Sequence, residues 1–331
     1  MKAEKIKGTL YAVDKKKNIK IAIIDLIERL KKGKDVESIK TSLAISEHQH
    51  EWESIANAIF EEWKNSQEFH EDEILVRDCN TKLAVFAFSL PTYATAKEAE
   101  DMLALFNEGR INASNVSQLI LPIVMEIRMR ALQQVGRYMK IPIFQEFAYF
   151  IDSATLAFYR GNMAAAFLTI VPVIEGILLR SMGFPNILTK KPEFKEIKEF
   201  IGRSIYRNPI PGLPQFFELY ISVADDIFRN HFYLNTEEGD AHGFFNRHLA
   251  LHMLDNKIFY SVDNVVRAFL LLDLMGEIYL REKQIADPRW ETKNEEIEKH
   301  LLGYTQAVRQ SLSSPAESIL SSYPSHFTSI I

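Results

Sequence analysis

The chain has 331 residues, of which 47% are apolar and 25% are charged, and this composition excludes the disordered and fibrous classes of protein. The net charge of -5 argues against a generally basic nucleic-acid coat, although it leaves room for a local basic groove. The single cysteine, Cys79, cannot form an internal disulfide and suits a reducing compartment. The N-terminus has lysines but lacks the apolar core of a secretory signal, so we expect a cytoplasmic protein.

Residues 1–140 are expected to form a helical N-terminal domain of unknown role. Two segments in it, 96–107 and 114–138, have the apolar spacing of helices. The stretch Leu83–Leu90 (LAVFAFSL) is compatible with a strand. Few other segments alternate apolar and polar residues, so the predicted fold class is all-α.

Residues 141–285 are expected to form a second helical domain, which opens with a helical hairpin. A helix from Phe144 to Tyr159 ends near Gly161, and a second helix runs from about Met163 to Met182 after a very short connection. A third segment, 286–331, is expected to hold one amphipathic helix and a Ser-rich tail. The remaining expected helices are near Pro192–Ser204, Gln215–Phe228, Val262–Glu282 and Glu295–Leu312.

The most apolar stretches are Ala164–Leu179 and Val265–Leu280. The first is interrupted by Pro172 and Glu175, and the second by two acidic residues. Both fall short of the roughly 20 apolar residues that span a bilayer. We therefore expect buried core helices and no membrane span.

The most informative string is Asn246-Arg247-His248-Leu249-Ala250-Leu251-His252. Asn246 is a favourable N-cap, which predicts that a helix begins at Arg247 or His248. Arg247 and His252 are five positions apart, so they project about 140° apart on a regular helix. Their side chains can converge only if Arg247 lies in the first turn and its long arm sweeps back, or if two copies of the chain meet.

This string resembles the Arg-x(4–6)-His signature of the HEPN superfamily, in which a polar residue often follows the arginine. The segment Phe158–Arg180 (FYRGNMAAAFLTIVPVIEGILLR) is similar to the helical hairpin of defence-type and uncharacterised bacterial members, with Glu175 at the place of a helical glutamate. The long apolar helix at Val262–Glu282 matches the closing helix, so the resemblance covers about residues 143–284. Met253 departs from the pattern, because related sequences often have glycine after the histidine.

The resemblance implies a metal-independent endoribonuclease without a cofactor, which acts as a homodimer with one motif from each subunit. An imidazole that titrates near neutrality suits proton transfer, which we assign to His252. A guanidinium stays charged and suits stabilisation of a phosphorane, which we assign to Arg247. His248 and Asn246 would orient the phosphate or the dimer partner, and Glu175 would position Arg247 or His248 if the two helices pack.

A structural interpretation of the same residues stays open. An Asn-Arg-His string at a helix start can form a cap and a buried ion pair with Glu175, and HEPN-like folds include members that only bind or dimerise. The alternative function is thus a non-catalytic dimerisation or interaction module that binds a partner protein or nucleic acid. We expect RNA as the partner of the nuclease, together with an antitoxin or regulatory protein if the setting is antiviral defence or a toxin–antitoxin pair.

A metal site is the weakest alternative. His248 and His252 are i, i+4 and share a helix face, as two metal ligands would. No glutamate lies between them, so the HExxH pattern is missing, and a third ligand would have to come from Asp240, His242 or Asp255. The prediction is therefore no metal ligand.

Overall fold

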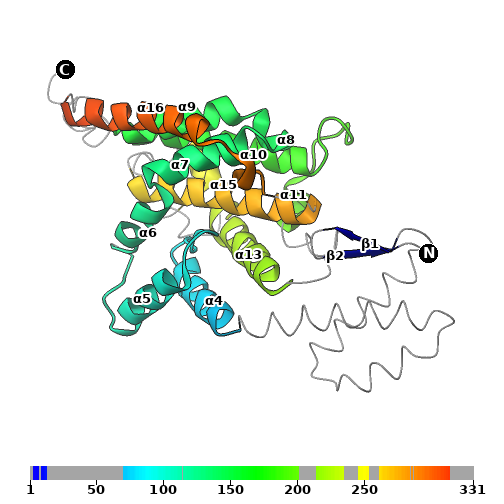
Figure 1. Ribbon diagram of the computed structural model, residues 1–331, viewed down its shortest axis with the longest axis horizontal. Coiled ribbons are helices and arrows are strands. Elements are labelled where there is room, and N and C mark those ends of the chain that lie inside the picture. The colour runs from blue at the N-terminus through cyan, green and yellow to red at the C-terminus, as the bar shows by residue number, and fades with distance from the viewer. Residues whose placement is uncertain are drawn as a thin grey trace. The chain divides into compact units, whose positions relative to one another are not determined.

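The computed structural model is all-α, as the sequence predicts (Figure 1). It describes residues 3–6, 9–12, 70–113, 115–200, 214–234, 245–252, 261–283, 285 and 287–313. The chain divides into two compact units. Unit 1 comprises Met1–Ile74 and Asn208–Glu218, and unit 2 comprises Leu75–Arg207 and Leu219–Ile331. The predictions made for the Ser-rich tail, for Met253 and for the loop ligands Asp240, His242 and Asp255 lie outside the described residues.

Unit 1 contains a short antiparallel ladder that the sequence analysis did not anticipate. Strand β1 (Ala3–Ile6) pairs with β2 (Thr9–Ala12), and the register joins Glu4 to Tyr11 and Lys5 to Leu10. Each strand has only four residues, which is too short for the alternation of apolar and polar residues to stand out in the sequence.

Helices make up most of the described residues. Two π-helical turns, η1 (Gln134–Tyr138) and η2 (Phe228–Phe232), and the 3-10 turn η5 (Pro288–Glu291) continue or connect them. The α-helices are α4 (His70–Ala84), α5 (Ala96–Asn107), α6 (Val116–Val124), α7 (Ile127–Gln133), α8 (Pro142–Gln145), α9 (Ala148–Tyr159), α10 (Met163–Ser181), α11 (Phe194–Phe200), α13 (Pro214–Ile227), α14 (Arg247–Leu251), α15 (Val262–Lys283) and α16 (Asn294–Ser313).

Helix α15 is the central element of unit 2. Every residue from Asn264 to Ile278 is buried, so the helix is covered on all sides. Helices α10 and α6 pack against it, and Figure 1 shows it in yellow and orange among the other helices of the unit. Burial on all sides explains why this stretch is so apolar.

The hairpin of α9 and α10 forms as expected, with Gly161 at the connection in the left-handed region at φ 83°. The helix expected from Phe144 begins instead at Ala148, because α8 ends at Gln145. Among the described helices, α10 alone is long and apolar enough to cross a membrane by length and composition. It is also a helix with buried faces, because Phe167, Ile170 and Ile174 are fully buried in the unit. Its contacts are those of a core helix.

Two expectations for the region before α8 are wrong. The segment 114–138 is not one helix, because α6 ends at Val124 and Glu126 caps a new helix by accepting hydrogen bonds from the N–H groups of Arg128 and Met129. Leu83–Leu90 is not a strand. Its first residues end α4 and a turn follows, after which residues 87–90 are buried and the Leu90 N–H donates to Asn80 at 2.7 Å.

The boundary expected near residue 140 falls inside unit 2. Helices α7 and η1, which precede it, pack against α16 and α9, which follow it. The shared apolar cluster consists of Ala131, Val135, Tyr159, Ile297, Tyr304 and Ala307. The physical reason is that the buried apolar residues of α7 and η1 complete their core with helices that follow the boundary.

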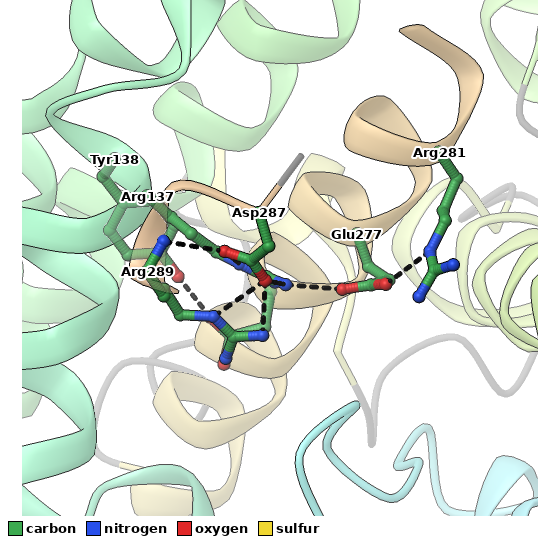
Figure 2. A network of polar contacts seen from close by, with 7 residues as sticks. Arg137, Tyr138, Glu277, Arg281, Asp287 and Arg289 are labelled. Atoms are coloured by element: carbon green, nitrogen blue, oxygen red, sulfur yellow. Dashed lines mark hydrogen bonds and ion pairs between the residues drawn. The ribbon is translucent and has the colours of Figure 1, made fainter. Parts of the chain in front are cut away.

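A buried polar network joins η1 to the end of α15 and to the segment before η5 (Figure 2). Arg137 donates through Nη2 to Glu277 and to Asp287, both at 2.5 Å. Asp287 also accepts from Arg289, and Glu277 accepts from Arg281 at 3.0 Å. Burial alone would raise the pKa of Asp287, but the hydrogen bonds from Arg137 and Arg289 outweigh it and hold the pKa well below its usual range.

A second buried ion pair joins α7 to α15. Arg130 of α7 and Asp273 of α15 form an ion pair with side chains that are 1% and 0% exposed. Tyr93 and Tyr138 also hydrogen-bond to Asp273, and Arg130 donates to the Tyr93 hydroxyl at 2.8 Å. Because burying an unpaired charge is costly, these pairs fix how α7 and η1 lie against α15.

Candidate functional site

Helix α14 begins where the sequence predicts, because Asn246 caps it. The Asn246 Oδ1 accepts hydrogen bonds from the N–H groups of His248 at 2.8 Å and Leu249 at 3.3 Å. Its Nδ2 donates to the carbonyl of Leu234 at 2.9 Å. Asn246 is 1% exposed, and its amide oxygen and amide nitrogen both bond to backbone groups. It therefore positions the residues that follow.

An aromatic cluster holds the start of α14 in place. Phe245, the residue before the cap, is fully buried. Its ring lies 5.0 Å from that of Phe232 at the end of η2 and 6.1 Å from that of Phe167 in α10. These contacts fix the position of the helix start, which a five-residue helix cannot fix by its own hydrogen bonds.

Arg247 turns from the first helical position of α14 toward α10. Its Nε donates to Glu175 Oε2 at 2.7 Å and its Nη2 to Glu175 Oε1 at 3.2 Å, in a two-pronged ion pair. Lys191, in the segment between α10 and α11, donates to the same Oε1 at 3.2 Å. The sequence predicts this contact between Glu175 and Arg247 if the two helices pack, and the structure contains it.

The two cations also set the charge state of Glu175. Burial raises the pKa of this carboxyl group, but the hydrogen bonds and charges of Arg247 and then Lys191 outweigh burial. The pKa of Glu175 therefore lies below its ordinary value, and the group is a carboxylate at neutral pH. The three charges sum to one net positive charge.

Tyr233 also contacts Arg247. The guanidinium carbon of Arg247 lies 5.1 Å from the centre of the Tyr233 ring, within reach of a cation–π interaction. Tyr233 is the C-cap residue of η2 and is 2% exposed, so the ring is a rigid surface. The guanidinium is thus held along one edge and one face.

His248 and His252 form an imidazole pair on the exposed side of α14. Their ring centroids are 4.5 Å apart, and both residues are exposed. His252 ends the helix, where its N–H donates to the His248 carbonyl at 3.1 Å. The i, i+4 spacing noted in the sequence therefore places both rings side by side and open to solvent.

The structure brings together some of the predicted site residues but not all. Arg247 meets Glu175, and His248 meets His252. Within the described part of the chain, no contact joins Arg247 to His252. Arg247 begins α14 and His252 is its C-cap, so more than one helical turn separates the two residues.

Two residues of this cluster were missed by the sequence analysis. Lys191 lies in a Lys-Lys-Pro string that matches no known motif. Tyr233 follows the helix expected at Gln215–Phe228, and that expectation singles out no residue beyond the end of the helix. No local signal singles out either residue, because both reach Arg247 or Glu175 only through the packing of distant elements.

Among the residues that the structure describes, no three His, Cys, Asp or Glu side chains gather as metal ligands would. A groove of about 580 Å³ between α4 and α5 contains none of the predicted site residues. Its lining residues are Leu75, Asp78, Thr81, Lys82, Glu100, Leu103, Ala104 and Asn107.

Comparisons with known proteins give no independent assignment. Neither the family models, nor the curated proteins, nor the solved structures include a match to this chain. A functional assignment therefore depends on the residues around Arg247 and on the motif resemblance.

Proposed function

We propose that this chain is a HEPN-type endoribonuclease that cleaves RNA without a metal ion. The observation that carries the proposal is the geometry of α14, in which a guanidinium braced by Glu175 and Tyr233 precedes two exposed imidazoles on the same short helix. These are the charged group and the proton-transfer group that cleavage of a ribose–phosphate linkage requires.

In the proposed reaction, a base removes the proton of the ribose 2′-hydroxyl. The 2′-oxygen then bonds to phosphorus, the bond from phosphorus to the 5′-oxygen breaks, and the leaving oxygen takes up a proton. The products are a 2′,3′-cyclic phosphate and a 5′-hydroxyl. His252 transfers a proton, and Arg247 stabilises the negative charge that gathers on the phosphorane oxygens. His248, beside His252, orients the phosphate.

Glu175 has a positioning role in this proposal. Its two oxygens hold the Nε and Nη2 edge of Arg247, which fixes the plane of the guanidinium. As in the related family, we propose a homodimer in which the motif of each subunit faces the other. The setting we propose, on the resemblance alone, is a cytoplasmic effector in phage defence or in a toxin–antitoxin pair with a regulatory partner.

The decisive experiment incubates the purified chain with tRNA and mRNA in the presence of EDTA. We expect wild-type cleavage that leaves cyclic phosphate ends, and a loss of about 100-fold or more in His252→Ala and in Arg247→Ala. Arg110→Ala and His300→Ala are matched controls, because Arg110 forms an exposed ion pair with Glu108 and His300 lies on α16. An inactive wild type, or a His252→Ala variant as active as wild type, would refute the proposal.

A non-catalytic interaction module is the second candidate. Arg247 is already engaged by Glu175 and Tyr233 and makes no described contact with His252, as a purely structural arginine would. In that case the same substitutions change the assembly state of the chain and no RNA is cut. Sedimentation of wild type and Arg247→Ala at matched concentrations separates the two candidates.

A further inference from the structure

Glu175 is shared between two cations that differ in how firmly they are held. Arg247 binds it through two hydrogen bonds, has a side chain 20% exposed and lies over Tyr233. Lys191 binds it through one bond of 3.2 Å and has a side chain 54% exposed. An exposed lysine pair contributes little to stability, whereas a stacked and bidentate arginine is costly to displace.

The cluster therefore contains one fixed cation and one that can leave at low cost. Glu175 has one negative charge, which Arg247 alone neutralises, so the charge of Lys191 is in excess. A lysine ammonium carries three donors, and only one of them is used on Glu175. A phosphodiester oxygen that approaches Arg247 meets this second cation at the same carboxylate.

We propose that Lys191 is a substrate-binding residue that leaves Glu175 to bind a phosphate of the RNA backbone. This inference rests on the proposed function and adds the residue that contacts a phosphate beside Arg247. Lys191 is a binding residue in this scheme and transfers no proton. The RNA phosphate replaces Glu175 as its counter-ion, while Arg247 keeps both of its bonds to the carboxylate.

The neighbouring lysine provides a matched control. Lys190 has the same charge and is one residue away, but its side chain is 82% exposed and pairs with Glu193. Lys190→Gln and Lys191→Gln therefore remove the same charge from the same segment. A general attraction of RNA to this surface is weakened equally by both, whereas a specific phosphate contact is lost only in Lys191→Gln.

The experiment measures binding of the full-length chain to a single-stranded 2′-O-methyl RNA oligonucleotide over a series of salt concentrations. The methyl group blocks the attacking oxygen, so binding is measured without cleavage. For Lys191→Gln we expect the slope of log affinity against log salt to fall by about 0.7, which at 0.1 M salt is about a fivefold loss of affinity. Lys190→Gln should keep the wild-type slope, and Lys191→Arg should restore it.

The outcomes separate the two proposals. Equal slopes in Lys190→Gln and Lys191→Gln, an unchanged slope in Lys191→Gln, or no binding by wild type each overturn the role of Lys191. A third outcome is that the salt slope falls in Lys191→Gln but not in Lys190→Gln, and that Lys191→Arg restores it. If wild type then cuts no RNA, Lys191 binds phosphate and the nuclease proposal fails. A Lys191→Arg variant that stays at the Lys191→Gln slope would show that the contact was structural, and it also overturns the inference.

Discussion

Arg247 and Glu175 are 72 positions apart in the chain, yet the guanidinium edge of one meets both carboxylate oxygens of the other. This ion pair ties α14, the helix that carries the candidate motif, to α10, which packs against the central helix α15. A five-residue helix gains little stability from its own hydrogen bonds, so this tie and the aromatic contacts of Phe245 hold it in place.

The Glu175→Gln substitution should therefore weaken the fold at the site. Glutamine keeps the size of the side chain but leaves the partly buried Arg247 without its counter-charge. We expect a loss of about 1–3 kcal/mol in the free energy of unfolding, measured by urea denaturation. Glu193→Gln, which breaks only the pair with Lys190, should unfold at the wild-type urea concentration. An identical urea midpoint for the two variants would mean that the ion pair between Glu175 and Arg247 contributes nothing to the free energy of unfolding.

Asn246 offers a test that separates stability from function. Asn246→Ala removes the cap of α14 and should cost roughly 1–2 kcal/mol. Thr95→Ala removes the capping box of α5 and should cost about 1 kcal/mol. If α14 carries the activity, RNA cleavage falls in Asn246→Ala well beyond any fall in Thr95→Ala. Equal cleavage by two variants of equal stability would place the active site elsewhere.

Asp287 predicts how stability depends on pH. Its pKa is depressed in the folded state, so its contribution is fully present above the pKa of an unfolded aspartate, about pH 4, and is lost as the pH falls through the folded-state pKa. Asp287→Asn should lose about 1–3 kcal/mol at neutral pH and show a shallower decline below pH 4. Parallel unfolding measurements on Asp101→Asn, whose side chain is 63% exposed beside Lys97, should reproduce the wild-type curve.

Two helical glycines should respond in opposite directions to alanine. A Cβ on Gly136 would lie 2.8 Å from Arg289 Cγ and 3.2 Å from the Arg289 Cα, so Gly136→Ala should cost about 1–3 kcal/mol. Gly303 has open space at the same position, so Gly303→Ala should stabilise α16 by about 0.5–1 kcal/mol. Thermal denaturation of both variants checks the pair, and a neutral Gly136→Ala would show that the segment at Arg289 shifts freely.

Sequence patterns predicted the elements whose signals are local. The span 96–107 matches α5 because Thr95 and Glu98 form a capping box, and the predicted start of α14 matches because Asn246 caps it. The predictions failed where a helix had to be interrupted. The span 114–138 has continuous helical spacing, but Glu126 begins a new helix inside it.

By itself, the sequence determined the all-α fold class, the hairpin of α9 and α10, the central apolar helix α15 and the cap at Asn246. Each of these follows from residue spacing or from a side chain acting within a few positions of itself. Only the tertiary structure decided that Glu175 meets Arg247 and Lys191, and that Arg137 meets Glu277 and Asp287, 140 and 150 positions away. Ion-pair partners depend on which helix faces pack together. A buried charge without a partner is costly, so the packing has to pair charges that lie far apart in the chain. No local sequence pattern encodes that pairing.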